Sequence, residues 1–139
     1  IKGVFMKVYK IFKDSIGQYE AVKQGWSWPA FFFEGIWACV KKIWGLGIVL
    51  IILALFAFAP IPISVTDTGE MEISGSAIFL IIIKLASLII KFILGAYGNE
   101  LREKNLISRG YQYQKKDTEF IIAQNPQMAI IQYISKYEK

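Results

Sequence analysis

The sequence contains no histidine and only one cysteine among its 139 residues. Histidine is the usual general base and the commonest metal ligand near neutral pH, so its absence argues against most hydrolytic and metal-dependent enzymes. The single Cys39 excludes a disulfide within the chain and a thiolate metal site. We therefore expect no catalytic residue, no metal site and no cofactor, and hence a protein that is not an enzyme.

Charged residues are also scarce, at 19% of the chain against 55% hydrophobic residues. Soluble domains average about 25% charged residues, so this composition favours a membrane protein. The net charge of +5 comes from 16 Lys and Arg against 11 Asp and Glu. No basic run alternates with aromatic residues on a recognisable module, so we expect no nucleic-acid partner. In a membrane protein the basic excess instead reports topology and contact with anionic lipid headgroups.

Two long apolar runs account for this composition. Residues 43–65 contain no ionisable side chain, and a helix of that length, rising ~1.5 Å per residue, crosses a hydrocarbon layer of ~30 Å. Residues 73–99 form the second run, and the connecting residues 66–72 carry acidic but no basic side chains. By the positive-inside tendency that loop lies outside and both termini lie in the cytoplasm. We therefore predict a mainly α membrane protein built on a two-helix transmembrane hairpin.

The stretch before the first run, residues 26–44, holds all four tryptophans. Ser27 and Pro29 are suited to the N-cap and the first turn of a helix, so we predict a helix that begins near Pro29. Its spacing places Phe33, Trp37, Val40 and Trp44 on one face, with Glu34, Ala38, Lys41 and Lys42 on the other. A helix of this kind lies in the membrane interface; the alternative is that it packs against a soluble tail. The expected interfacial anchors are Trp26, Trp28, Phe31, Phe32, Phe33, Trp37 and Trp44.

The second apolar run has a stripe of small and polar residues along one side. At 100° per residue these residues all fall within about 60° of Lys84. They are Ala77, Lys84, Ser87, Lys91, Gly95 and Gly98. Small residues allow close helix approach and charges avoid lipid, so the stripe predicts a helix–helix contact or a wet crevice. Gly47, Ala54 and Ala57 form a weaker matching groove on the first run.

Lys84 falls near the expected midplane of the bilayer, where a charged side chain is unfavourable. No acidic residue of the first run can pair with it, and Glu34 could reach it only if the aromatic helix enters the bilayer. Three interpretations remain open: a ligand or ion site, packing against a partner subunit, or snorkelling without a special role. Lys91 is closer to the cytoplasm, where its stem can snorkel.

The two ends of the chain predict a small α+β cap. Residues 1–25 form a cytoplasmic segment with a short strand at 6–13, followed by a loop or a short helix near 19–23. Residues 100–139 first extend the second membrane helix as far as Gly110 and then predict a strand at 118–123. Asn125 and Pro126 are suited to begin a last helix. We expect the two strands to lie together under that helix.

Three passages resemble a bacterial family known as domain of unknown function 2628. They are MKVYKIF from Met6, GWSWPAFFFEGIWACVKKIW at 25–44 and GNELREKNLISRGY at 98–111. The matching positions are Trp26, Trp28, Pro29, Phe31, Phe32, Phe33, Trp37, Asn99, Glu100, Gly110 and Tyr111, whereas Glu34 stands where the motif has Gly. The resemblance implies a small inner-membrane protein with an apolar hairpin, and it carries no established activity.

These observations favour a non-enzymatic accessory or scaffold subunit. It would dock onto a larger membrane complex through Lys84, Ser87, Lys91 and Gly95. Two alternatives remain: a homo-oligomeric pore or transporter component whose stripe lines an anion-favouring path, and a lipid-binding surface module. The expected partners are a bilayer with anionic headgroups and either other membrane subunits or further copies of the chain.

Overall fold

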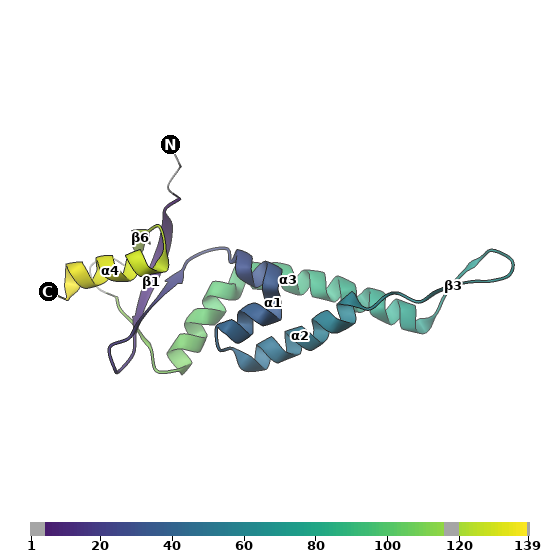
Figure 1. Cartoon of the computed structure of the whole chain (residues 1–139), viewed down its shortest axis with the longest axis horizontal. Helices are drawn as coiled ribbons and strands as arrows, with labels where there is room; N and C mark the ends of the chain where they lie inside the picture. Colours follow the sequence, from purple (N-terminus) through teal and green to yellow (C-terminus); the bar gives the residue numbers. More distant parts are fainter. Residues whose placement is uncertain (1–4, 116–119, 139) are drawn as a thin grey trace. The chain divides into compact units, whose positions relative to one another are not determined.

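The structure, a computed structural model, describes residues 5–115 and 120–138. The chain divides into two compact units. Residues 1–26 and 97–139 form the sheet unit, and residues 27–96 form the helical unit. In chain order the elements are β1 (Lys7–Lys13), β2 (Tyr19–Lys23), α1 (Trp28–Val40), α2 (Trp44–Phe58), β3 (Ile63–Val65), β4 (Met71–Ile73), α3 (Gly75–Ser108), β5 (Gln112–Tyr113), β6 (Ile121–Ala123) and α4 (Pro126–Tyr137) (Figure 1). The long helix α3 contributes residues to both units.

In the sheet unit β1 is the central strand, and β2, β5 and β6 all pair with it antiparallel. Successive β1 side chains point to opposite faces, so Tyr9 and Ile11 pack with Tyr133 of α4. Phe12 faces the other way and packs with Leu106 at the end of α3. The predicted pairing of the N-terminal and C-terminal strands under the last helix is therefore present. Positions 118 and 119 of the predicted strand lie outside the described residues.

The loop or short helix expected near 19–23 is instead the strand β2. A tight turn causes this: the Asp14 carboxylate accepts hydrogen bonds from the backbone N–H groups of Ile16 and Gln18, at 3.1 and 2.7 Å. Gly17 has a φ of +86°, a left-handed conformation that glycine adopts without steric cost. The turn sends the chain back along β1 as a hairpin.

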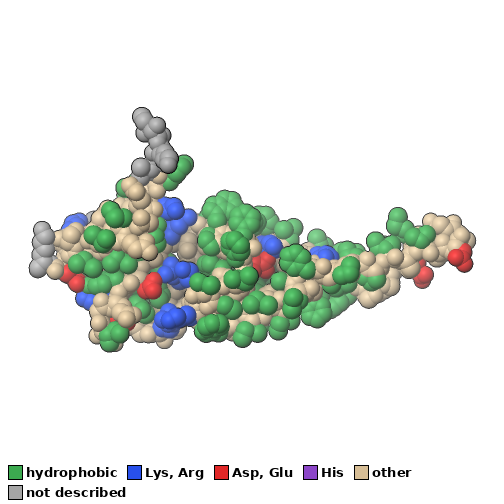
Figure 2. All heavy atoms as spheres, viewed as in Figure 1, with side chains coloured by type: hydrophobic (Ala, Val, Ile, Leu, Met, Phe, Trp, Pro, Cys, Tyr) green, Lys and Arg blue, Asp and Glu red, His purple; other side chains and the backbone are tan. Residues whose placement is uncertain are grey.

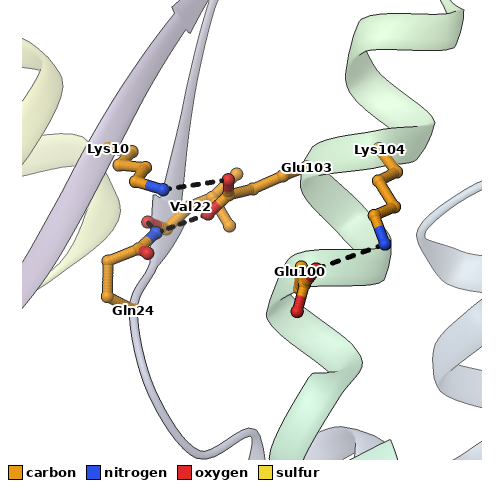
Figure 3. A network of polar contacts seen from close by, with 6 residues as sticks. All are labelled: Lys10, Val22, Gln24, Glu100, Glu103 and Lys104. Atoms are coloured by element: carbon orange, nitrogen blue, oxygen red, sulfur yellow. Dashed lines mark hydrogen bonds and ion pairs between the residues drawn. The ribbon is translucent and has the colours of Figure 1, made fainter.

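Polar contacts hold the last turns of α3 against this hairpin (Figure 3). The Glu103 carboxylate lies 3.2 Å from Lys10 Nζ and accepts a 2.7 Å hydrogen bond from Gln24 Nε2. Arg102 forms a 2.7 Å ion pair with Glu20 of β2. These contacts fix the helix to both strands, whereas the exposed pair of Glu100 and Lys104 on α3 contributes only ~0.3–0.5 kcal/mol.

The structure does not have the predicted two-helix transmembrane hairpin. The helix expected over 43–65 ends at Phe58, so α2 has 15 residues against the ~20 that a bilayer requires. Pro60 disfavours a helical conformation at the residue before it, and Ala59 has a ψ of 139°. The chain then forms the β3–β4 hairpin in place of the expected external loop. Among the described residues, α3 is the only helix long and apolar enough to cross a membrane.

In the helical unit, two glycines let α1 and α2 pack at close range. A Cβ atom added at Gly35 would lie 2.7 Å from the carbonyl oxygen of Gly47 and 2.8 Å from the backbone nitrogen of Ile51. A Cβ atom added at Gly47 would collide with the Cys39 sulfur. Neither position therefore has room for a side chain, and the contact depends on both glycines.

Candidate functional site

Polar side chains in the helical unit gather around one cavity of about 220 Å³. Lys84, Ser87 and Lys91 line it from α3, and Glu34 lines it from α1. The remaining lining residues are Ala54, Ala57 and Phe58 of α2 and Leu88 of α3. We call this site the lysine pocket.

Glu34 interrupts the helix α1. Its φ of +30° and ψ of −102° are non-helical, and a side-chain-bearing residue adopts such a conformation at a cost of ~1–3 kcal/mol. The side chain is only 8% exposed, and its Oε1 lies 3.0 Å from Lys91 Nζ. Its Oε2 is buried without a hydrogen-bond partner among the described residues. The break thus places a carboxylate inside the helical unit, beside a lysine.

The break also explains why the predicted aromatic face is wrong. Trp37, expected on that face, is 6% exposed, while Phe33 and Trp44 are each 61% exposed. Ala38, expected on the opposite face, is fully buried. The helical periodicity restarts after Glu34, and a turn that contains Lys42 at φ +61° separates α1 from α2. No single helical face therefore runs from residue 33 to residue 44.

The aromatic residues expected as interfacial anchors fall into an exposed group and a packed group. Trp28, Phe32, Phe33 and Trp44 are exposed. Phe31 packs edge to face on Phe92 of α3, with ring centroids 5.3 Å apart. Trp37 is part of the buried core of the helical unit, and Trp26 belongs to the sheet unit. The four exposed rings remain suited to a membrane interface.

Lys84 provides a hydrogen-bond donor for the C-terminal end of the helix α2. Its Nζ donates a hydrogen bond to the carbonyl oxygen of Ala57, in the last turn of that helix. The last carbonyls of a helix have no partner within it, and the helix dipole favours a cation there. The Ala59 N–H donates a hydrogen bond to a second carbonyl of this turn, that of Phe56. Lys84 therefore stabilises the end of α2, because one of its last carbonyl groups would otherwise lack a donor beside the apolar helix α3.

The other stripe residues also make contacts inside the chain. Ala77 and Ser87 are buried, and the Gly95 carbonyl accepts a 2.7 Å hydrogen bond from Ser27 N–H at the start of α1. Gly98 belongs to the sheet unit, where it is buried. The weaker groove predicted on the first run does face the stripe, since Ala54 and Ala57 line the same cavity as Lys84. A role for the stripe in docking a partner stays a prediction.

Sequence reasoning missed the pair of Glu34 and Lys91. The available signal was that Glu34 is the only acidic residue between positions 21 and 66, and that a lysine in an apolar run needs an acceptor. Two ammonium groups and one carboxylate can bind and orient an anionic group that also donates hydrogen bonds. In the described part of the chain, no group of three or more acidic or cysteine side chains could hold a metal ion.

A second polar cluster lies in the sheet unit, between β1 and the end of the chain. Lys13 Nζ is 2.7 Å from Glu138 Oε1, and this hydrogen bond raises the pKa of the lysine. Burial raises the pKa of the Tyr19 and Tyr133 hydroxyls, whose rings lie 6.0 Å apart. Near physiological pH the lysine is charged and both tyrosines are neutral, and the upward shifts extend these states to higher pH, which suits a structural role.

Comparison with known proteins identifies a family. The family described as "Protein of unknown function (DUF2628)" matches residues 4–107, which is more than half of the chain. The match covers β1, β2, all residues of the lysine pocket and nearly all of α3. No curated protein and no solved structure has significant similarity to the chain.

Proposed function

The chain belongs to the DUF2628 family, and we propose that it is a non-enzymatic integral membrane protein, an accessory or scaffold subunit of a larger membrane complex. The observation that carries this proposal is the inverted distribution of side chains in the helical unit. Phe32, Leu55 and Ile89 are between 60% and 69% exposed, whereas Glu34 and Ser87 are buried.

Such a surface requires an apolar environment. Figure 2 shows hydrophobic side chains over most of the visible face of the three helices. Monomeric soluble proteins rarely expose apolar patches beyond a few hundred Å². Lipid around α1, α2 and α3 covers this surface, and the 34-residue helix α3 is long enough to cross the bilayer.

The distribution of basic residues supports an orientation in the bacterial inner membrane. No Lys or Arg occurs between positions 43 and 83, and the turn of the β3–β4 hairpin carries Asp67 and Glu70. Both chain ends contribute strands to the same basic sheet unit. By the positive-inside tendency we infer that both termini lie in the cytoplasm. The surrounding bilayer supplies the anionic headgroups.

The sheet unit offers a surface for a membrane-protein partner. On α4, Ala129 and Tyr133 face the sheet, while Met128, Ile131 and Ile134 are between 37% and 58% exposed at a spacing of three residues. These three side chains share one helix face, which points away from the apolar core of the sheet unit. An apolar helix face of this kind docks into a groove of another protein.

Gentle-detergent purification of the tagged full chain tests the proposal. We expect a larger membrane complex to co-purify at fixed stoichiometry, and Ile131→Glu to release it. The neighbouring exposed Gln132→Glu, which adds the same charge on another face of α4, is the matched control and should retain the complex. Recovery of a lone monomer, or of a homo-oligomer, would overturn the accessory role. Release from membranes by alkaline carbonate would overturn the membrane location.

A further inference from the structure

We propose that the lysine pocket binds one singly charged phosphate group that carries a hydroxyl. The phosphate oxygens accept hydrogen bonds from Lys84 and Lys91, and the hydroxyl donates to Glu34 Oε2. This site goes beyond the accessory role, and only its lipid source rests on the proposed membrane location.

The charge of the pocket selects the ligand. Lys84 and Lys91 contribute two positive charges and Glu34 contributes one negative charge, so the lining residues leave one positive charge uncompensated. The Ala57 carbonyl that Lys84 contacts is neutral and does not cancel it. An uncompensated charge among apolar helices is unfavourable. A monoanion brings the site to neutrality, whereas a cation or a dianion leaves it charged.

The hydrogen-bonding groups select the same ligand. Each lysine ammonium has three N–H donors, and the structure gives each of them one acceptor in this pocket, Ala57 O for Lys84 and Glu34 Oε1 for Lys91. The remaining donors suit phosphate oxygens. Glu34 Oε2 is a buried acceptor without a partner among the described residues, and buried polar atoms are nearly always hydrogen-bonded. The ligand must therefore supply a donor as well as a negative charge.

The shape of the pocket leaves room for such a group. Its volume of about 220 Å³ exceeds the ~150 Å³ that accommodates a benzene-sized molecule. Ala54 and Ala57 contribute only methyl groups to the wall. The strained backbone at Glu34 holds the carboxylate in this wall, and such strain is frequent at binding sites. Two sources have the required chemistry: the headgroup of phosphatidylglycerol and free dihydrogen phosphate.

Binding is measured on the purified full chain in an uncharged detergent. All four tryptophans lie at 26–44, so their fluorescence reports thermal unfolding of the region that contains Glu34. We expect phosphatidylglycerol or phosphate to raise the unfolding temperature and phosphatidylcholine, which has no hydroxyl donor and no net charge, to leave it unchanged. A rise with the lipid alone identifies a lipid site, and a rise with both identifies a phosphate site open to either source. No rise with either probe overturns the proposal.

Three variants separate binding from folding. Lys84→Met should weaken binding at least about tenfold, while Lys104→Met, the same change at an exposed position of α3, should not alter it. Because Lys84→Met also removes the contact to α2, Glu34→Gln provides a test of opposite sign. It removes the only negative charge of the pocket lining and replaces the Oε2 acceptor by an amide donor, so sulfate, a dianion without a hydroxyl, should bind about tenfold more tightly than to the unmodified chain, which a purely structural role would not cause. Unchanged or weaker sulfate binding by Glu34→Gln contradicts the proposal. Binding that persists in a chain found outside membranes would refute the membrane location alone.

Discussion

In the sheet unit the apolar Phe12 and Val22 are buried, and ion pairs such as Arg102–Glu20 lie near the surface. The helical unit has the opposite arrangement: the apolar Phe32 and Leu55 are exposed and the charged Glu34 is buried. Water stabilises the first arrangement because it solvates the charges and drives apolar side chains together. It opposes the second arrangement, which suits lipid. One chain of 139 residues thus combines a unit with an apolar interior and a unit whose exposed apolar side chains support the proposed membrane location.

The difference also changes what a charged pair does. Glu103 in the sheet unit contacts both Lys10 and Gln24, so each of its carboxylate oxygens has a partner. Glu34 in the helical unit has a partner at one oxygen only, Lys91. The sheet unit therefore uses its ion pairs to hold α3, while the helical unit leaves one carboxylate oxygen without a partner among the described residues, which is the acceptor for the proposed ligand.

The largest expected effect comes from truncating a buried phenylalanine, compared with the same truncation at an exposed one. Phe12→Ala should lower the free energy of unfolding by about 3–5 kcal/mol because it empties a site that is 1% exposed. Phe58→Ala, the same change at a position that is 84% exposed, should change it by less than about 0.5 kcal/mol. Denaturant unfolding in mild detergent, followed by circular dichroism, measures both. Equal losses would contradict the assignment of opposite environments.

The ion pair of the buried Glu34 with the half-buried Lys91 comes next. Glu34→Ala leaves Lys91 without its carboxylate partner and should cost about 1–3 kcal/mol, because the remaining ammonium is partly solvated. Adding Lys91→Met should recover most of this loss because the double variant contains no unpaired charge. A double-mutant cycle, followed by tryptophan fluorescence, yields the coupling energy. Additive losses would show that the two side chains do not interact.

An effect of similar size is expected from the glycine contact between α1 and α2. Gly35→Ala should cost about 1–3 kcal/mol because the new methyl group meets backbone atoms at 2.7–2.8 Å. Gly45→Ala is the control: no atom lies within 4 Å of its added Cβ, and alanine favours the helix by up to about 1 kcal/mol. The midpoints of detergent-phase unfolding should move in opposite directions. A destabilised Gly45→Ala would remove the packing explanation.

The smallest effect is a loss of sheet-unit stability in alkali. The pKa values of Tyr19 and Tyr133 are raised by burial, and that of Lys13 by its hydrogen bond to Glu138. The folded unit therefore retains protons that the unfolded chain releases above about pH 10, and this contribution is lost as the pH rises through the folded values. Hydrogen exchange of β1 should accelerate there, and Tyr133→Phe should reduce the pH dependence. Stability that rises with pH would contradict these shifts.

Much of the local structure follows from short stretches of sequence. Ser27 caps α1 by accepting a hydrogen bond from Ala30 N–H at 3.4 Å, and Asn125 caps α4 through Met128 N–H at 2.8 Å, as predicted. Gly110, predicted to end the helix, follows its last turn with a φ of +90°. The end of α2 at Phe58 differs from the prediction because the apolar composition continues to residue 65, whereas Pro60 ends the helix before it.

The candidate site was only half predictable. Spacing alone placed Lys84, Ser87 and Lys91 on one side of a helix, and all three line the pocket. The same reasoning placed Glu34 on the polar face of an interfacial helix, because a regular helix was assumed through that position. The break at Glu34 changes the direction of every later side chain in α1, and no local preference of glutamate favours a φ of +30°.

The sequence by itself determined where helices begin, which segments are apolar and which residues of α3 share a side, because caps, composition and helical periodicity act over a few residues. Only the tertiary structure decided that α1 breaks at Glu34, that Lys84 caps α2 and that Lys91 finds a carboxylate. A strained backbone and buried charges persist only where close packing, here through Gly35 and Gly47, and complementary partners stabilise them, and those come from distant parts of the chain.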